Sequence, residues 1–123
     1  MKEQEILENN KLIDQFMTSR TPIEFEEGLY MGRLRGSSPK YYNYYDTIAI
    51  KDLQYHTSWD WLMPVVEKIE AMGWDTDICF NSNLHACIIT KKGEEWGIDI
   101  IDDTKLSATY QAVVGFIKQV TTP

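Results

Sequence analysis

The sequence has few cysteines, a deficit of basic residues and no long apolar run. Its 123 residues include two cysteines, Cys79 and Cys87, too few for a disulfide scaffold, so we expect free thiols in a reducing compartment. Lys and Arg number 12 against 19 Asp and Glu, and the net charge of -7 argues against general nucleic-acid binding. No segment approaches the ~20 apolar residues that cross a bilayer, and the N-terminus lacks a signal-peptide core. We therefore expect a cytoplasmic protein with no membrane partner.

The composition is that of an ordinary folded domain. Apolar residues make up 43% of the chain and charged residues 25%, which excludes global disorder. A chain of this length can bury one core. We expect a single α+β domain over residues 1–123, without internal repeats.

A first amphipathic helix is predicted from Glu3 to Met17. Its apolar side carries Ile6, Ile13, Phe16 and Met17, and its polar side carries Glu3, Glu5, Glu8, Lys11 and Asp14. This pattern is typical of a helix that packs on a core.

A second helix follows Thr57 or Ser58, either of which can cap it. Regular helix is expected from Leu62, because Pro64 lacks an amide hydrogen and disturbs the first turn. Gly73 is the expected stop. One face is apolar and comprises Leu62, Val65, Val66, Ile69 and Met72.

The chain from Trp74 to Asp102 changes to a period of two, which predicts three antiparallel strands joined by short turns. A third helix from about Ser107 to Val120, with Ser107 as cap, carries a stripe of Leu106, Tyr110, Val113, Val114 and Ile117. Together these patterns predict a small three- or four-stranded antiparallel meander packed with three amphipathic helices, an α/β sandwich.

Residues 21–54 are predicted to be a mostly irregular insertion, with one short strand around Thr47 to Ile50. Long loops of this kind are often functional. This segment holds the one basic patch and a run of tyrosines, so we name as candidate binding residues Arg33, Arg35, Lys40, Tyr41, Tyr42, Tyr44 and Tyr45, with Trp59 beside them. Arginine forks and stacking tyrosines suit a phosphate or nucleotide, and they equally suit a protein interface. A solvated loop whose tyrosines pack on the fold is the plainer interpretation.

Other reactive side chains give weaker patterns. Cys79, His85 and Cys87 are zinc-type ligands, but a structural site needs four, so packing is the default and no metal is expected. His85 and Cys87 lie two apart on one strand and could meet as a base and a nucleophile, although no orienting group can be named. Carboxylates at the strand ends could gather around a divalent cation or simply keep the protein soluble; they are Asp75, Asp77, Asp99, Asp102 and Asp103.

Three segments carry a resemblance to a known group. KLIDQFM (11–17), YHTSWDWLMPVVEKIE (55–70) and ATYQAVVGFIKQ (108–119) resemble small phage- and prophage-encoded proteins, notably of Bacteroidetes, and the layout is distantly similar to the phage ABA sandwich domain. The resemblance implies a compact α/β sandwich in a bacterial host cell, with no established activity and no functional residues to transfer.

Three functional hypotheses follow. The first is a non-catalytic binding protein of phage or prophage biology, with a host-interaction or counter-defence role. Its contact surface would lie in residues 28–61, and its partner would be a protein or a small anionic ligand. Homo-oligomers could form through exposed aromatic residues of the same segment. The second is a nucleotide- or phosphate-binding protein or enzyme that uses Arg33 and Arg35. The third is a structural assembly component. The first hypothesis, the non-catalytic binding protein, assigns no catalytic residue and no cofactor.

Overall fold

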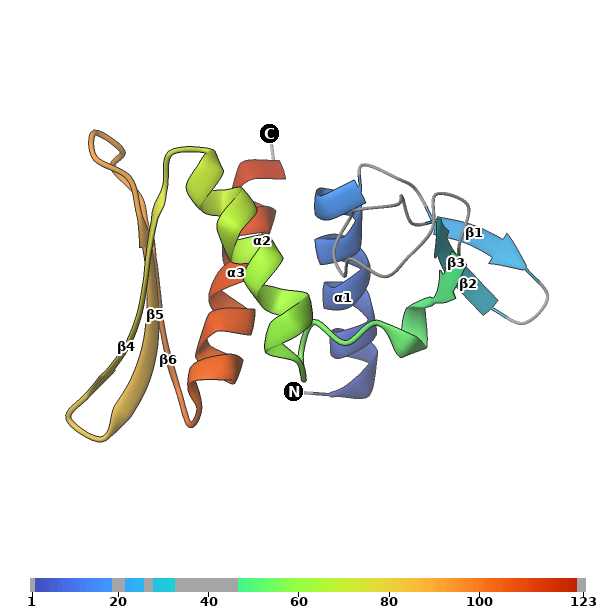
Figure 1. The fold of residues 1–123 in the computed structure, drawn as a ribbon, viewed down its shortest axis with the longest axis horizontal. Coiled ribbons are helices and arrows are strands. Elements are labelled where there is room, and N and C mark those ends of the chain that lie inside the picture. Colours follow the sequence, from blue (N-terminus) through green and yellow to red (C-terminus); the bar gives the residue numbers. More distant parts are fainter. Residues whose placement is uncertain (1, 19–21, 26–27, 33–46, 122–123) are drawn as a thin grey trace. The chain divides into compact units, whose positions relative to one another are not determined.

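The computed structural model describes residues 2–18, 22–25, 28–32 and 47–121 (Figure 1). The chain divides into two compact units, Met1–Pro64 and Val65–Pro123, which are taken in turn below. The expectation of a single domain over residues 1–123 stays a prediction. None of the described helices is long and apolar enough to span a membrane.

The first unit begins with helix α1 (Glu3–Thr18), close to its predicted bounds. Three strands follow, β1 (Pro22–Phe25), β2 (Gly28–Gly32) and β3 (Thr47–Ala49), paired antiparallel in that order, and a short 3-10 helix, η1 (Ile50–Asp52), comes next. The short strand at Thr47 is confirmed.

The prediction of mostly irregular structure over residues 21–54 was wrong for β1 and β2. Gly28 and Gly32 are the two end residues of β2, although glycine is a residue type that often interrupts strands. Tyr30 in this strand pairs on one side with Ile23 and on the other with Ala49, nineteen positions later (49 − 30). Pairing of β2 with β3 over such a separation leaves no local periodicity. Phe25 of β1 and Gly28 of β2 pair across only two intervening residues, but these are Glu26 and Glu27, which are not a typical hairpin-turn sequence, so the β1–β2 hairpin was missed as well.

Helix α1 buries polar as well as apolar side chains. Ile13 is fully buried, as predicted, but Asp14 is also fully buried, although its position was assigned to the solvent side. Asn9, Asn10 and Thr18 are buried as well. The apolar stripe therefore describes only part of the face that this helix turns inward.

Helix α2 (Trp59–Ala71) runs across the boundary between the two units. The carbonyl of Ser58 accepts the amides of Trp61 and Leu62 at 3.2 and 3.0 Å, so the helix begins before Leu62 despite Pro64. Gly73 ends it with a φ of +95°, as predicted. Met72 lies beyond the last helical residue and is 42% exposed, so it is not part of the buried stripe.

The second unit contains an antiparallel meander of β4 (Asp75–Asn81), β5 (Leu84–Thr90) and β6 (Ile98–Asp102), in chain order. Ser82 and Asn83 join β4 to β5 with φ values of 53° and 67°, the backbone of a two-residue type I′ turn. The predicted meander and the α+β fold class are confirmed.

Helix α3 (Lys105–Thr121) lies along one face of this sheet (Figure 1). Its cap is Thr104, whose hydroxyl oxygen accepts the amide of Ser107 at 3.0 Å, so Ser107 was wrongly predicted as the cap. The predicted stripe residues Tyr110, Val113, Val114 and Ile117 are all buried.

An aromatic cluster closes the end of the second unit that lies away from Thr104. The rings of Trp74 and Trp96 have centroids 4.4 Å apart, and Phe116 of α3 lies 5.1 Å from Trp74 and 5.8 Å from Trp96. Lys91 places its ammonium 5.8 Å from the Trp74 ring. Trp74 and Trp96 are therefore packing residues.

Candidate binding surface

Most of the predicted binding residues lie outside the described part of the chain. These are Arg33, Arg35, Lys40, Tyr41, Tyr42, Tyr44 and Tyr45, and their role stays a prediction. Trp59 is described: it is the first residue of α2 and is 37% exposed. Trp61, two residues on, is 7% exposed and packs edge-on against Tyr55 at 5.1 Å. The two tryptophans therefore differ in exposure, and Trp59 is the one that a partner could reach.

The zinc-type residues do not converge. In the register of the sheet Cys79 pairs with Ala86, whereas Cys87 pairs with Ile78. Directly paired residues share a face and neighbours alternate, so Cys79 points to one side of the sheet while His85 and Cys87 point to the other. No group of three or more potential metal ligands occurs among the described residues. The register of β4 with β5 therefore places the two thiols on opposite faces of the sheet.

Cys87 is not a plausible nucleophile. Its side chain is fully buried, and burial raises the pKa of the thiol to about 11, with smaller contributions in the same direction from Cys79 and Asp77. A thiol with that pKa is neutral near pH 7, and the thiolate is the reactive form. The ring of His85 instead lies against the ring of Phe80, with the two centroids 4.7 Å apart and the planes tilted by 35°. The cysteine-histidine pair is a packing arrangement.

Asp102 joins β6 to the first turns of α3. One carboxylate oxygen accepts the amide of Asp103 at 2.8 Å, and the other accepts the hydroxyl of Ser107 at 2.5 Å and the side-chain amide of Gln111. The bond from Ser107, followed by that from Asp103, lowers the pKa of Asp102. Asp102 therefore acts as a structural tie. It shares the α3-facing side with His85, its partner in the register, and is separated from the other strand carboxylates.

A buried polar network in the first unit was not predicted. The side-chain amide of Asn10 donates to the Leu53 carbonyl at 3.1 Å and lies 3.0 Å from Nδ1 of His56. One turn later the Tyr55 hydroxyl donates to Asp14 at 2.6 Å. Asn10 and Asp14 follow Ile6 of the apolar side of α1 at intervals of four residues, so all three lie on the same side of the helix. This spacing was the sequence signal that could have predicted their burial.

The geometry of this network fastens residues 53–56 to α1. Burial lowers the pKa of His56, which favours the neutral imidazole. A neutral ring with its proton on Nε2 can accept the Asn10 amide at Nδ1. Asn10 and Asp14 are buried, at 1% and 0% exposure, so they are not presented to a substrate. We interpret the network as a positioning device for the entry to α2.

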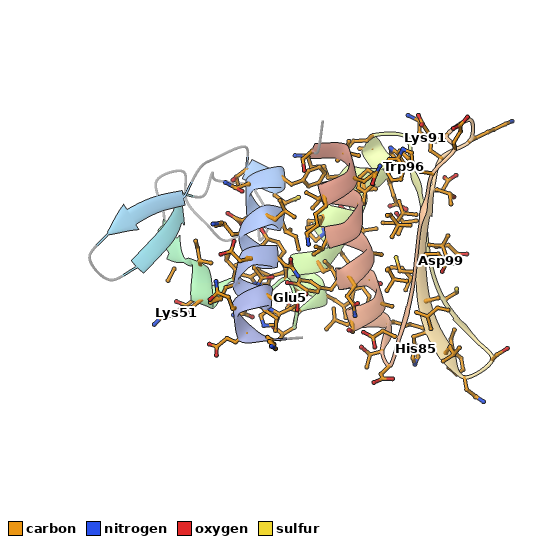
Figure 2. The ribbon with its side chains drawn as sticks, turned by 180° about the vertical axis from the view of Figure 1, so that it is seen from behind. Glu5, Lys51, His85, Lys91, Trp96 and Asp99 are labelled. Atoms are coloured by element: carbon orange, nitrogen blue, oxygen red, sulfur yellow. The ribbon has the colours of Figure 1, made fainter. Side chains whose placement is uncertain are left out.

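The face of the sheet that points away from α3 carries exposed residues of all three strands. Cys87 and Ile89 are fully buried on the α3 side, and a Cβ on Gly115 of α3 would lie 3.6 Å from the Ile98 side chain. Figure 2 shows His85 on this helix side and Asp99 on the opposite side. No described element of the second unit covers that opposite side, here called the outer face.

The outer face consists of an apolar end and an acidic end. Near the β4–β5 turn, Cys79, Ala86 and Ile101 form one row across the three strands, with Leu84 beside them. Ile101 is 57% exposed and Leu84 is 49% exposed. Toward the other end, the next row contains Asp77, Ile88 and Asp99, and Asp75 follows opposite Thr90. The three carboxylates are exposed.

Comparison with known proteins adds no family. No protein-family model matches the chain, and no curated protein or solved structure matches it significantly. The resemblance to phage and prophage proteins therefore stays a prediction.

Proposed function

We propose that this protein is a non-catalytic binding protein that recognises a protein partner. The observation that carries the proposal is the outer face of the second unit, where Ile101 and Leu84 are exposed on the side of the sheet that no described element of that unit covers. Exposed apolar clusters with a polar rim are typical of interaction sites. The chemistry of the described reactive residues agrees with a binding role, because Cys87 is buried and Asp102 is fully engaged in hydrogen bonds.

The outer face is rigidly supported, which suits recognition. Ile101 belongs to β6, whose next residue, Asp102, is tied to Ser107 and Gln111 of α3. Leu84 follows the tight turn at Ser82 and Asn83. A face held in this way loses little conformational entropy when a partner binds.

We propose a phage or prophage setting and the cytoplasm of a bacterial host, with a host-interaction or counter-defence role. The support for this setting is the resemblance of the three helical segments. Trp59, exposed at the start of α2, supports a second contact in residues 28–61.

The test is affinity purification from cells that naturally carry the gene, with quantitative mass spectrometry. The tagged protein is compared with the double variant Leu84→Ser/Ile101→Ser and with Met72→Ser as the matched control. Met72 is also an exposed apolar residue, at 42%, but it lies after α2 and outside the outer face. Thermal unfolding of each variant checks that the fold is retained.

We expect at least one protein to be enriched with the wild type and the control and to be lost with the double variant. An identical set of partners for all three proteins, or no enriched partner at all, would refute the proposal.

A further inference from the structure

We propose that the outer face takes a basic amphipathic helix of a partner protein, seated over β5 with its apolar side on Leu84 and Ile101 and its cationic side chains on Asp77 and Asp99. The inference rests on the proposed function and names the chemistry of the partner.

The charge of the sheet is of one sign. Its three strands contain four aspartates and no Lys or Arg. Asp102 is engaged with Ser107 and Gln111 on the other face, which leaves Asp75, Asp77 and Asp99 on the outer face. These three are exposed, and none forms an ion pair with another residue in the described ranges. A partner that covers Ile88 must bring positive charge to them or leave carboxylates desolvated and unpaired.

The spacing of these groups fits a helix. Asp77 and Asp99 flank Ile88 from the two neighbouring strands, so their Cα atoms stand about 10 Å apart, twice the interstrand distance. This is the width of an α-helix with its side chains. The β5 strand from Leu84 to Thr90 extends over roughly 20 Å, which a helix of about 13 residues spans. The opposite face of the same strands already accepts a helix, α3, of 17 residues.

The same charges argue against other occupants. A second copy seated face to face would bring together two surfaces that carry only negative charge, and like charges at an interface are unfavourable. Nucleic acid and anionic lipid surfaces carry the same sign as the face and would be repelled. A cationic polypeptide is the macromolecule whose charge complements the surface.

The experiment uses the full chain and synthetic helical peptides of about 14 residues, long enough to cover β5. One peptide places Leu on one helical face and Lys on the other. A second has the same composition in a scrambled order without an apolar face, and a third replaces Lys with Glu. Binding is measured by fluorescence anisotropy at low and high salt, and sedimentation velocity and vesicles of anionic lipid test the other occupants.

Two variants address the charges. Asp77→Asn/Asp99→Asn removes both carboxylates from the face, and Glu67→Gln/Glu70→Gln removes two exposed charges from α2 as the matched control. We expect the amphipathic cationic peptide to bind more tightly than the scrambled and acidic ones. Exposed charge pairs contribute modestly, so the Asp77/Asp99 variant should bind roughly five- to tenfold more weakly at low salt, with the difference shrinking at high salt. The Glu67/Glu70 control should bind like the wild type.

Equal binding of the amphipathic and scrambled peptides, or equal binding by the wild type and the Asp77/Asp99 variant, would overturn the inference. Self-association of the protein, or its binding to anionic vesicles, would also overturn the inference if either is lost in the Leu84→Ser/Ile101→Ser variant of the outer face. If the cell-derived partner depends on Leu84 and Ile101 but not on the carboxylates, this inference fails while the proposed function stands. If no partner depends on the face, the proposed function fails as well.

Discussion

Replacing Gly115 with alanine should stabilise the protein. Gly115 lies inside α3, where glycine costs about 1 kcal/mol relative to alanine because it fixes a more flexible backbone. A Cβ built there would lie 3.6 and 3.8 Å from two carbon atoms of Ile98, which is ordinary van der Waals contact. The site is half-buried, so the methyl group adds at most about 0.5 kcal/mol of apolar burial. The expected gain in the free energy of unfolding is therefore about 1 to 1.5 kcal/mol.

Gly97 provides the opposite case at the entry to β6. A Cβ at this position would meet the Ile89 carbonyl oxygen at 3.0 Å and the Thr90 Cγ2 at 3.1 Å. Both distances are shorter than ordinary van der Waals contact. The nearer atom belongs to the backbone of β5, which cannot move without disturbing the sheet. We expect Gly97→Ala to destabilise the protein by about 1 to 3 kcal/mol, the usual cost of overpacking.

Urea unfolding followed by tryptophan fluorescence measures both changes, because Trp74 and Trp96 report on the packing of the second unit. For a chain of this size a gain of 1 kcal/mol raises the melting temperature by about 3 to 5 °C. A Gly115→Ala variant less stable than the wild type would refute the packing of α3 on β6 described here. A neutral Gly97→Ala variant would contradict the close approach of residue 97 to β5.

Two further predictions concern titratable groups. A thiol reagent should label Cys79 in the native protein and Cys87 only on unfolding. The native pKa of Cys87 is raised from 9.0 to about 11, so the stability that the neutral thiol contributes below pH 9 should be lost as the pH rises toward 11. Urea titrations at alkaline pH should show this loss in the wild type and not in Cys87→Ala. Labelling of both thiols at equal rates would be inconsistent with the burial of Cys87. The pKa of Asp102 is lowered in the folded state, so its contribution is present above its ordinary value of 3.8 and is lost as the pH falls through the lower native value. Melting temperatures between about pH 5 and pH 2 should fall further for the wild type than for Asp102→Asn, and parallel curves would show that its hydrogen bonds do not matter.

Local patterns were sufficient for most of the regular structure. The stripe of Val65, Val66 and Ile69 indicated α2, and the alternation from Ile78 to Ile100 indicated the meander, because burial on one side imposes a period of 3.6 on helices and 2 on strands. Both predictions are confirmed. The prediction of the cap was less accurate, since Thr104 rather than Ser107 caps α3 and Asp102 accepts the Ser107 hydroxyl.

The candidate surface was much harder to find from the chain. The residues named for binding lie mainly in 33–45, outside the described ranges, and Trp59 is the member whose exposure is seen. The outer face was missed because alternation shows that a strand has two sides without showing which side a helix covers. Ile101 has the same apolar character as Ile100, yet it stands 57% exposed.

The sequence by itself determined the α+β class, the three helices and the meander, because periodicity and turn residues act over a few positions along the chain. Only the tertiary structure decided the pairing of β2 with β3, the burial of Asp14 beneath Tyr55 and the separation of Cys79 from Cys87. Each of these depends on which distant segments meet, and the register of a sheet or the packing of a helix is set by that encounter. The outer face is a consequence of the same kind: α3 covers one side of β4–β5–β6, and Ile101 and the aspartates of the other side are exposed.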